Sequence, residues 1–284
     1  MAGVNPVRRA LARAVAELER SGVASPRADA EQLAAHVLGV PRGRLALVDT
    51  FPPPAAARFQ ELVARRAERV PLQHLTGTVG FGELELAVGP GVFIPRPETE
   101  LLAQWAVAQP ASVVVDLGSG TGALALSIAH ARPQARVYAV EASAAARAWL
   151  RRNAADRARA GDRPIEVVAG DATDPAVLSE LDGTVDLVVC NPPYVPDGVP
   201  VPPEVAEHEP PEAVFAGADG LAVIRPVLAR AAALLRPGGQ LGIEHDQTHG
   251  EAVPALMRRW FTDVVDHRDL AGRPRYATGR RMAD

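Results

Sequence analysis

The stretch "SVVVDLGSGTGALALS", residues 112–127, decides the fold that we predict for this chain. It opens with a run of β-branched residues, as expected of a strand that is covered on both faces. Gly118, Gly120 and Gly122 follow, and the chain continues as an apolar helical pattern. Many Gly-rich turns are merely tight turns. Between a strand and a helix, however, such a turn predicts the ligand-binding turn of a Rossmann-like α/β sheet.

Strands and helices continue to alternate after this turn. The segments "ARVYAVEA", "IEVVAGDA", "VDLVVCNPPY" and "QLGIEHD" read as strands with helical patterns between them. The stretch "GLAVIRPVLARAAALLRPGG" predicts a long helix that ends in a Pro-Gly-Gly turn. The remainder predicts one more helix and one or two terminal strands. Alternation of this kind indicates a doubly wound α/β sheet.

The chain before this sheet has a different organisation. The segments "VRRALARAVAELERSG", "SPRADAEQLAAHVLGV" and "PPPAAARFQELVARRAERV" carry apolar residues at helical spacing. They predict a small helical domain over residues 1–72. Short alternating runs separated by glycine in "GTVGFGELELAVGPG" predict a β-hairpin linker over residues 73–97. The α/β domain then occupies residues 98–284.

Composition excludes several functions. The 284 residues include 30 basic ones, and every one of them is arginine. The lack of lysine excludes a Walker lysine, a Schiff-base lysine and a lysine general base. The net charge of −4 argues against a protein that grips nucleic acid by its phosphates. With one cysteine, Cys190, and no long apolar run, we expect a cytoplasmic protein without a membrane span.

Acidic residues close the first three predicted strands: Asp116, Glu141 and Asp171. An acid at the end of the second strand can accept hydrogen bonds from both hydroxyls of a ribose. The G-x-G-x-G turn lacks the wider spacing that a pyrophosphate demands, and Asp171 is placed to meet an adenine edge. Each acid could instead cap a helix or a turn. Three acids in this order are the pattern of S-adenosylmethionine (SAM) methyltransferases, whose product is S-adenosylhomocysteine.

The fourth strand ends in Asn191, Pro192, Pro193 and Tyr194. This "NPPY" could be a strand terminator with a buried tyrosine, but its place beside the ligand crevice favours a catalytic role. A planar NH₂ group has two N–H donors that need acceptors in a closed site. The Asn191 side-chain oxygen and the Pro192 carbonyl can supply them, and Tyr194 offers a flat face. These residues leave a carboxamide and an aromatic amine open as methyl acceptors.

Other candidates are weaker. His245 and His249 have helical spacing but lack the HExxH zinc pattern, so we expect strand-end structure and no metal site. Cys190 is expected to be a small buried strand residue.

The motifs "FIPRPETE", "DLGSGTGALALS", "NPPY", "EPPEAVFAGADGL", "EHDQ" and "RDLAGRPR" occur in this order along nearly the whole chain. In this the sequence resembles the HemK/PrmC-type methyltransferases, which methylate the glutamine side-chain amide in the GGQ motif of peptide chain release factors. The resemblance implies a class I SAM-dependent methyltransferase with a small N-terminal helical domain. The alternative hypothesis is an adenine amino-methyltransferase acting on DNA or RNA. A third possibility is a non-catalytic SAM-fold module.

The resemblance also implies roles for individual residues. The turn formed by Gly118, Ser119, Gly120, Thr121 and Gly122 would hold the methionine end of SAM, next to Asp116. Glu141 stands where family members often have Asp, and it would bind the ribose. Ala172, beside Asp171, stands where the family often has a larger residue near adenine, so the adenine contact is open.

On the substrate side, Asn191 would touch both the cofactor and the amide, with Pro192, Pro193 and Tyr194 completing the glutamine pocket. Phe93 and Arg96 would lie near the substrate loop. The alternative for Arg96 is a purely structural salt bridge with Glu98 or Glu100.

The resemblance further implies partners. We expect class 1 peptide chain release factors to dock on the N-terminal helices, a monomeric enzyme, and no nucleic-acid or membrane partner. The Pro-rich segment 195–220 cannot be regular structure by its composition. Its part over residues 195–211, directly after Tyr194, is expected to form a substrate-contacting lid.

Overall fold

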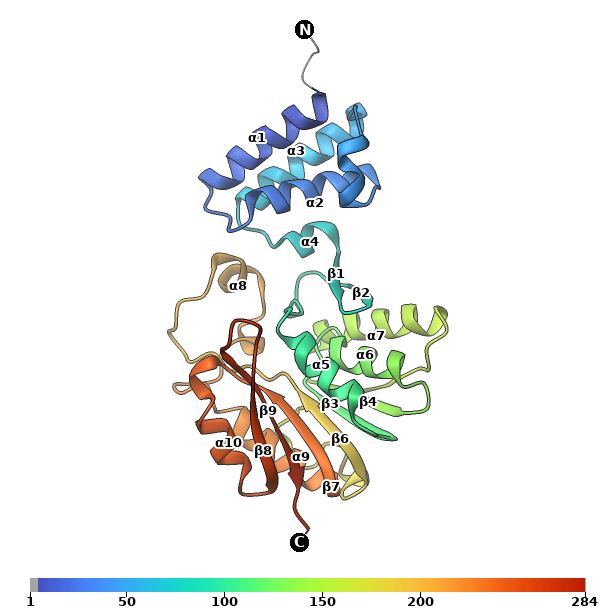
Figure 1. Ribbon diagram of the computed structural model, residues 1–284, viewed down its shortest axis with the longest axis vertical. Helices are drawn as coiled ribbons and strands as arrows, with labels where there is room; N and C mark the ends of the chain where they lie inside the picture. The colour runs from blue at the N-terminus through green and yellow to red at the C-terminus, as the bar shows by residue number, and fades with distance from the viewer. Residues whose placement is uncertain (1–4, 284) are drawn as a thin grey trace. The chain divides into compact units, whose positions relative to one another are not determined.

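The computed structural model of this chain describes residues 5–283, and the chain forms two compact units. The first unit comprises Met1–Thr78 together with Val201–His208. The second comprises Val79–Pro200 and Glu209–Asp284. Figure 1 shows the first unit as a group of helices and the second as a sheet flanked by helices.

The first unit is built from α1 (Pro6–Arg20), α2 (Pro26–Leu38), the 3₁₀ helix η1 (Arg42–Leu47), α3 (Pro53–Ala67) and α4 (Leu72–Thr76). The three helical patterns read from the sequence are confirmed. Asn5 caps α1 by accepting a hydrogen bond from the Val7 amide at 2.7 Å, and Gly39 ends α2 in a left-handed conformation. Leu18, Leu33 and Leu62 are fully buried where α1, α2 and α3 meet.

The Pro-rich segment after Tyr194 is not free of regular structure, so that prediction is wrong. It contains α8 (Pro203–His208) and the short 3₁₀ helix η3 (Pro211–Ala213). Prolines open both helices, where the missing N–H does no harm. Helix α8 belongs to the first unit, which the sequence pattern did not show.

An ion-pair network holds α8 in the first unit. Glu204 accepts hydrogen bonds from Arg66 at 2.7 Å and, through its two oxygens, from Nε and Nη2 of Arg69 at 2.8 and 2.6 Å. Arg66 is itself buried and also donates to Asp29 at 2.7 Å. Burial alone would raise the pKa of Glu204, but the hydrogen bonds from Arg69 and Arg66 outweigh it and lower that pKa to about 2.

The predicted hairpin is present as β1 (Thr78–Phe81) and β2 (Leu84–Ala87), which form a two-stranded sheet. Helix α4 occupies the start of the stretch that we read as linker.

The second unit is a seven-stranded sheet in the order β5-β4-β3-β6-β7-β9-β8. Its strands are β3 (Val113–Leu117), β4 (Arg136–Glu141), β5 (Glu166–Ala169), β6 (Val185–Cys190), β7 (Leu235–Glu244), β8 (Phe261–Arg268) and β9 (Pro274–Arg281). The strands from β5 to β7 pair in parallel, and β9 pairs antiparallel with both β7 and β8. The doubly wound sheet is confirmed.

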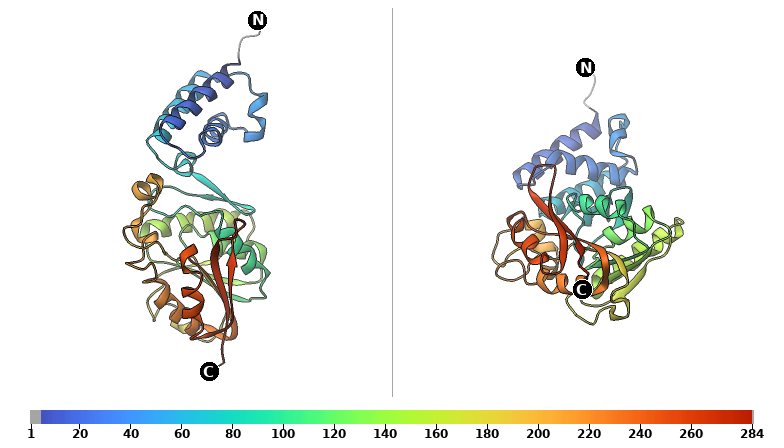
Figure 2. Two further views of the ribbon diagram at one scale, coloured as in Figure 1. Left: turned by 60° about the vertical axis from the view of Figure 1, so that its left-hand side comes forward. Right: turned by 60° about the horizontal axis from the view of Figure 1, so that its bottom comes forward.

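Helices cover both faces of this sheet (Figures 1 and 2). On one face lie α5 (Thr99–Ala108), α6 (Ala123–Ala131) and α7 (Ala144–Arg159), and on the other α9 (Ile224–Leu234) and α10 (Ala252–Met257). Neighbouring strand residues serve opposite cores: Val114 packs with α6 and Val115 with α9. The continuous apolar run in β3 follows from this double coverage.

The Pro-Gly-Gly sequence does not terminate the long helix. Helix α9 ends at Leu234, and Pro237–Gly239 fall in the irregular first part of β7, where the pairing with β6 shifts between Val185 and Leu187. A Cβ at Gly239 would lie 3.0 Å from the Arg236 and Val185 carbonyl oxygens, so a larger residue there would require the backbone to shift.

Within residues 5–283, we find no helix of the length and apolarity needed to cross a membrane.

Candidate functional site

The strand register brings the predicted site residues to one edge of the sheet. Leu117, at the end of β3, pairs with Val140 of β4 on one side and with Cys190 of β6 on the other. Gly118 and Asn191 directly follow the paired residues Leu117 and Cys190. The glycine turn and the NPPY segment therefore begin next to each other, where the chain connections diverge to opposite faces of the sheet.

The same register adds a residue from β7. Cys190 pairs in parallel with Ile243, so Glu244 follows beside Asn191. On the far side, Glu141 ends β4 and pairs with Ala169 of β5. The carboxyl ends of these strands thus bring two acids and an amide to the edge that carries the glycine turn.

The glycine turn has open space above it. Gly118 and Gly120 have φ of 78° and 55°, and a Cβ at either position would meet nothing within 4 Å. Gly122 differs, because its Cβ would lie 2.6 Å from Leu150 and 3.0 Å from Leu126. The first two glycines leave room for a ligand at the backbone, and the third lets α6 pack closely.

Glu141 is bound to this turn. One carboxylate oxygen accepts a hydrogen bond from the Gly120 amide at 2.9 Å, and the other accepts one from the Ser143 amide at 2.8 Å. Each carboxylate oxygen has a second lone-pair direction, so these contacts orient the group and leave it able to accept from a ribose.

Asp116 is buried, with 1% of its surface exposed. One oxygen accepts a hydrogen bond from the Ala125 amide at 3.2 Å, whereas Oδ1 has no hydrogen-bond partner within the described chain. The Ser119 hydroxyl donates to the Asp116 backbone carbonyl at 3.0 Å, which braces the turn. Burial, and to a smaller extent the nearby charge of Glu141, raise the pKa of Asp116 to about 7 against the hydrogen bond from the Ala125 amide.

These features fit SAM. Its methionine end carries an ammonium group, which is the kind of cation that a buried carboxylate with an unpartnered oxygen lacks. Asp116 and the turn from Gly118 to Gly122, including the buried Thr121, would hold that end. Glu141 would hold the ribose.

Asp171 caps the turn that follows β5. The exposed Asp171 accepts hydrogen bonds from the Thr173 amide at 2.8 Å and hydroxyl at 2.7 Å. This is the turn-capping role that we gave as its structural alternative. Ala172 is half-buried and packs on the core shared by β3, β6 and α9.

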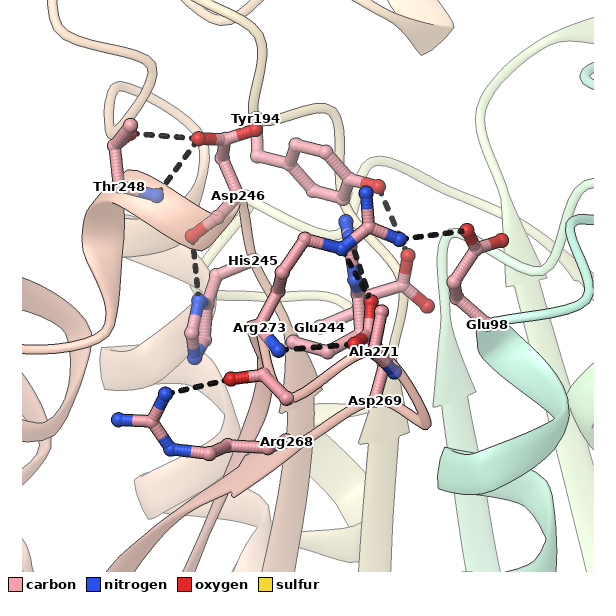
Figure 3. Close-up of polar contacts among 12 residues, drawn as sticks. Glu98, Tyr194, Glu244, His245, Asp246, Thr248, Arg268, Asp269, Ala271 and Arg273 are labelled. Atoms are coloured by element: carbon pink, nitrogen blue, oxygen red, sulfur yellow. Dashed lines mark hydrogen bonds and ion pairs between the residues drawn. The ribbon is translucent and has the colours of Figure 1, made fainter.

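The NPPY segment is joined to two buried residues from elsewhere in the chain. The Asn191 amide nitrogen donates to the Thr99 hydroxyl at 3.1 Å, and that hydroxyl donates to Glu244 at 2.7 Å. The Tyr194 hydroxyl donates to the other oxygen of Glu244 at 2.9 Å, as Figure 3 shows. Burial raises the pKa of Glu244 to about 7, with Arg275 opposing the shift.

The backbone behind NPPY is held by the "EPPEAVFAGADGL" segment. Val195 donates from its amide to the Val214 carbonyl at 3.0 Å and accepts from the Ala216 amide at 2.9 Å. A Cβ at Gly220 would overlap the Tyr194 carbonyl oxygen. The half-buried Pro193 and buried Pro192 thus start a rigid connection that is clamped again directly after Tyr194.

Phe93 and Arg96 contact each other, and Arg96 also forms an ion pair with a residue that the sequence did not indicate. The Arg96 guanidinium lies 4.5 Å from the centre of the Phe93 ring. It pairs with Glu209 at 2.5 Å, so the suggested salt bridge with Glu98 or Glu100 is not the one found. Burial raises the pKa of Glu209, and its second oxygen is buried without a hydrogen-bond partner in the described chain.

The two histidines near the end of β7 have structural partners. His245 is fully buried and pairs through Nδ1 with the Asp246 carbonyl at 2.9 Å, and His249 pairs through Nε2 with the Asp219 carbonyl at 3.0 Å. Over residues 5–283, no group of three or more metal-ligating side chains gathers. Burial raises the pKa of the Cys190 thiol, which keeps it protonated and unreactive.

The "RDLAGRPR" motif forms the turn between β8 and β9. Asp269 accepts hydrogen bonds from the Ala271 and Arg273 amides, both at 2.9 Å, and from the Arg273 and Arg275 side chains at 2.9 and 3.3 Å (Figure 3). Arg273 also lies 3.9 Å from Glu98. This turn therefore places Arg273 next to Glu98 of the "PETE" segment.

Sequence reasoning missed Thr99, Glu244 and Gly220. Glu244 carried a usable signal, because it closes the strand "QLGIEHD" just as Asn191 closes its own strand. Thr99 lies at the start of a helix, where threonine is ordinary, and nothing local indicates its partners. Gly220 could be suspected only as one more loop glycine.

Comparison with known proteins gives the chain a family. A model described as the PrmC N-terminal domain matches residues 9–77, and one described as the methyltransferase small domain matches residues 84–207. A solved structure of the 16S rRNA N2 G1207 methyltransferase RsmC from Thermus thermophilus, in complex with AdoMet and guanosine, shares the fold. It has a TM-score of 0.51 and 21% identity, and the match covers 73% of this chain and 45% of that one.

Sequence relatives are much closer. The release factor glutamine methyltransferase of Mycolicibacterium smegmatis is 56% identical, and the match covers 98% of each chain. That of Corynebacterium glutamicum is 47% identical, with 96% of this chain and 98% of the relative covered. With this identity over nearly its full length, the chain is a SAM-dependent methyltransferase that belongs to the release factor glutamine methyltransferase family.

Proposed function

We propose that this enzyme transfers a methyl group from SAM to the side-chain amide nitrogen of the glutamine in the GGQ motif of class 1 peptide chain release factors. The observation that carries the proposal is the strand register that sets Asn191 next to the open turn at Gly118. Family membership supports the choice of a glutamine amide over an aromatic amine.

The site suits a planar NH₂ group. The nitrogen lone pair of an amide is delocalised, so the nitrogen is a poor nucleophile that must be held in place. Asn191 can accept from one N–H through its side-chain oxygen, and the rigid Pro192 can direct its carbonyl at the other. Tyr194 offers a flat face to the amide plane. Holding the nitrogen in one orientation is catalysis by positioning, for which effective molarities are large.

SAM, when bound, supplies a methyl group on an electrophilic sulfonium. The chain's own residues hold the acceptor amide, orient it and exclude water. Burial raises the pKa of Tyr194 well above its ordinary value, so its hydroxyl keeps its proton and acts as a hydrogen-bond donor.

Further parts of the proposal concern the partner. The helical unit would contact the release factor away from its GGQ loop, and Phe93 and Arg96 would lie near that loop. The segment from Val195 to Pro211 would act as a substrate-contacting lid, supported by its place directly after Tyr194. The enzyme would work in the cytoplasm and as a monomer. One chain carries every residue of the proposed site, so catalysis requires no second copy.

One labelling assay tests the activity. Purified enzyme is mixed with radiolabelled SAM and, in parallel, with a release factor, the same factor with GGQ changed to GGA, DNA and RNA. Label in the unaltered factor alone is the expected result. Label in nucleic acid would favour the adenine methyltransferase, and no label in any mixture would favour a non-catalytic module.

The lid is tested separately by hydrogen exchange. Backbone amides of residues 195–211 should gain protection when release factor is added. Equal protection with and without the factor would count against a lid.

A further inference from the structure

Asn191 is connected through Thr99 to a buried carboxylate by a chain of hydrogen bonds. The Asn191 amide lies 3.1 Å from the Thr99 hydroxyl, which lies 2.7 Å from Glu244. Thr99 and Glu244 are 3% and 1% exposed, so water does not take their place as partners. These hydrogen bonds connect the residue after β6 to the end of β7 and the start of α5.

The direction of the hydrogen bonds from Asn191 through Thr99 to Glu244 follows from the chemistry of the Glu244 carboxylate. An ionised carboxylate only accepts hydrogen bonds. Glu244 accepts from Thr99 on one oxygen and from Tyr194 on the other. Burial raises the pKa of Glu244, whereas the hydrogen bonds from Thr99 and Tyr194 and the charge of Arg275 on β9 lower it and favour the ionised form.

The hydrogen bond from Thr99 to Glu244 in turn fixes the orientation of the Asn191 amide. The Thr99 hydroxyl has one proton, and that proton is committed to Glu244. Toward Asn191 it can therefore only accept, so the Asn191 group that faces it must be the NH₂. The side-chain oxygen of Asn191 is consequently the end left for a ligand.

This orientation matters because the two ends of an asparagine amide have nearly the same shape. If Asn191 turned over, its NH₂ group would face the N–H donors of an incoming amide, and two donors cannot satisfy each other. We propose that Thr99 and Glu244 are positioning residues that hold the Asn191 amide with its oxygen toward the methyl acceptor. The inference rests on the proposed role of Asn191 as hydrogen-bond acceptor for the substrate.

A first experiment removes the Thr99 hydroxyl, which links Asn191 to Glu244, without changing the volume of the side chain. Thr99→Val should lower kcat on the release factor by about 10- to 100-fold, as loss of orientation at a reacting group does. Thr99→Ser, which keeps the hydroxyl, should stay within about threefold of wild type. Thr278→Val is the matched control, because Thr278 is similarly buried and bonds instead to His267.

The affinity for SAM, measured by calorimetry, should change less than about twofold in all three variants, which also shows that they fold. A wild-type kcat in Thr99→Val would overturn the inference. Equal losses in Thr99→Ser and Thr99→Val would overturn it too, because packing rather than the hydroxyl would then be responsible.

A second experiment reverses the direction of the hydrogen bonds between Asn191, Thr99 and Glu244. Asn191→Asp places an oxygen against Thr99, whose proton is already given to Glu244, so kcat should fall about 100-fold or more. Adding Glu244→Gln lets the introduced amide donate to Thr99, and the Thr99 hydroxyl can then donate to the introduced carboxylate. The oxygen of the introduced amide still accepts from Tyr194, so every partner in the double variant is satisfied.

The double variant should therefore recover about 10-fold or more of the activity that Asn191→Asp alone loses. A double variant as slow as the product of the two single effects would refute the inference, since a purely structural role predicts no rescue. Wild-type turnover on release factor tests the proposed function, whereas the ratios among variants test the hydrogen-bond direction. The same ratios apply to whichever amine the wild type is found to methylate.

Discussion

Gly220 touches the backbone of Tyr194 so closely that no side chain fits between them. A Cβ at Gly220 would overlap the Tyr194 carbonyl oxygen and would lie 2.8 Å from the His249 ring. Gly220 also has a φ of 70°, which other residues rarely adopt. The loop glycine thus fixes the backbone at the end of the NPPY segment.

Gly220→Ala should both destabilise the enzyme and slow it. Strain at positive φ costs about 1–2 kcal/mol, and displacement of the Tyr194 backbone adds to it, for a total of about 3 kcal/mol or more. Urea denaturation and kcat on release factor measure the two effects. Gly272→Ala separates them, because Gly272 has a φ of 79° but open space around its Cβ. Similar losses in both variants would mean that strain alone explains the result.

Asn191→Ala should abolish turnover far more than cofactor binding. The side chain is proposed to accept a hydrogen bond from the amide that reacts, so its loss should lower kcat by about 100-fold or more. The affinity for SAM should change by only a few-fold. Calorimetry and steady-state kinetics measure the two quantities, and an equal loss in both would show that Asn191 serves the cofactor instead.

Asp116→Asn should stabilise the ligand-free protein at alkaline pH. The folded-state pKa of Asp116 is raised to about 7 by burial, above the usual 3.8. Its contribution to stability is therefore complete below about pH 4 and is lost as the pH rises through 7. At pH 8 the variant should be more stable by about 2–4 kcal/mol, and less so at pH 5.

The same variant should bind SAM weakly, because the ammonium group loses its carboxylate partner. Denaturation at both pH values and calorimetry test the pair of effects, with the exposed Asp174→Asn as control. If Asp116→Asn lowers stability at pH 8, the ionised Asp116 carboxylate does not destabilise the folded protein as its burial indicates.

Turnover at saturating SAM should depend on the ionisation of Glu244. Burial raises the pKa of Glu244 to about 7 against the hydrogen bonds from Thr99 and Tyr194, while Arg275 lowers it and Glu98 raises it. Only the ionised form accepts from both hydroxyls, so kcat should rise as the pH increases to about 7 and then level off. Glu244→Gln should lack this step. A wild-type profile that is flat between pH 6 and 8 would contradict the prediction.

Glu204→Gln should destabilise the helical unit. The hydrogen bonds from Arg69 and Arg66 hold the pKa of Glu204 at about 2 despite its burial, below the usual 4.5. Its stabilisation is present above about pH 4.5 and is lost as the pH falls through 2. The expected loss at pH 7 is about 1–3 kcal/mol by urea denaturation. Glu61→Gln breaks an exposed pair with Arg58 and should cost almost nothing, so equal effects would argue against the importance of burial.

Local patterns in the sequence were sufficient for most of the elements. The Pro-rich segment was the main exception, since its prolines suggested irregular chain whereas they open α8 and η3. Proline is compatible with the first turn of a helix, so composition alone could not separate the two. The end of α9 was placed too late for a related reason, because Pro-Gly-Gly disrupts a strand start as readily as it stops a helix.

What the sequence by itself determined was the sheet and the edge that carries the site. Parallel strands end on one edge, so residues that close successive strands, such as Glu141 and Asn191, had to gather there. The tertiary structure alone decided which distant side chains meet. Thr99 reaches Glu244 across 145 positions, and Glu204 reaches Arg66 across 138. Such contacts follow from how helices pack on the sheet and on each other, and no local periodicity encodes them.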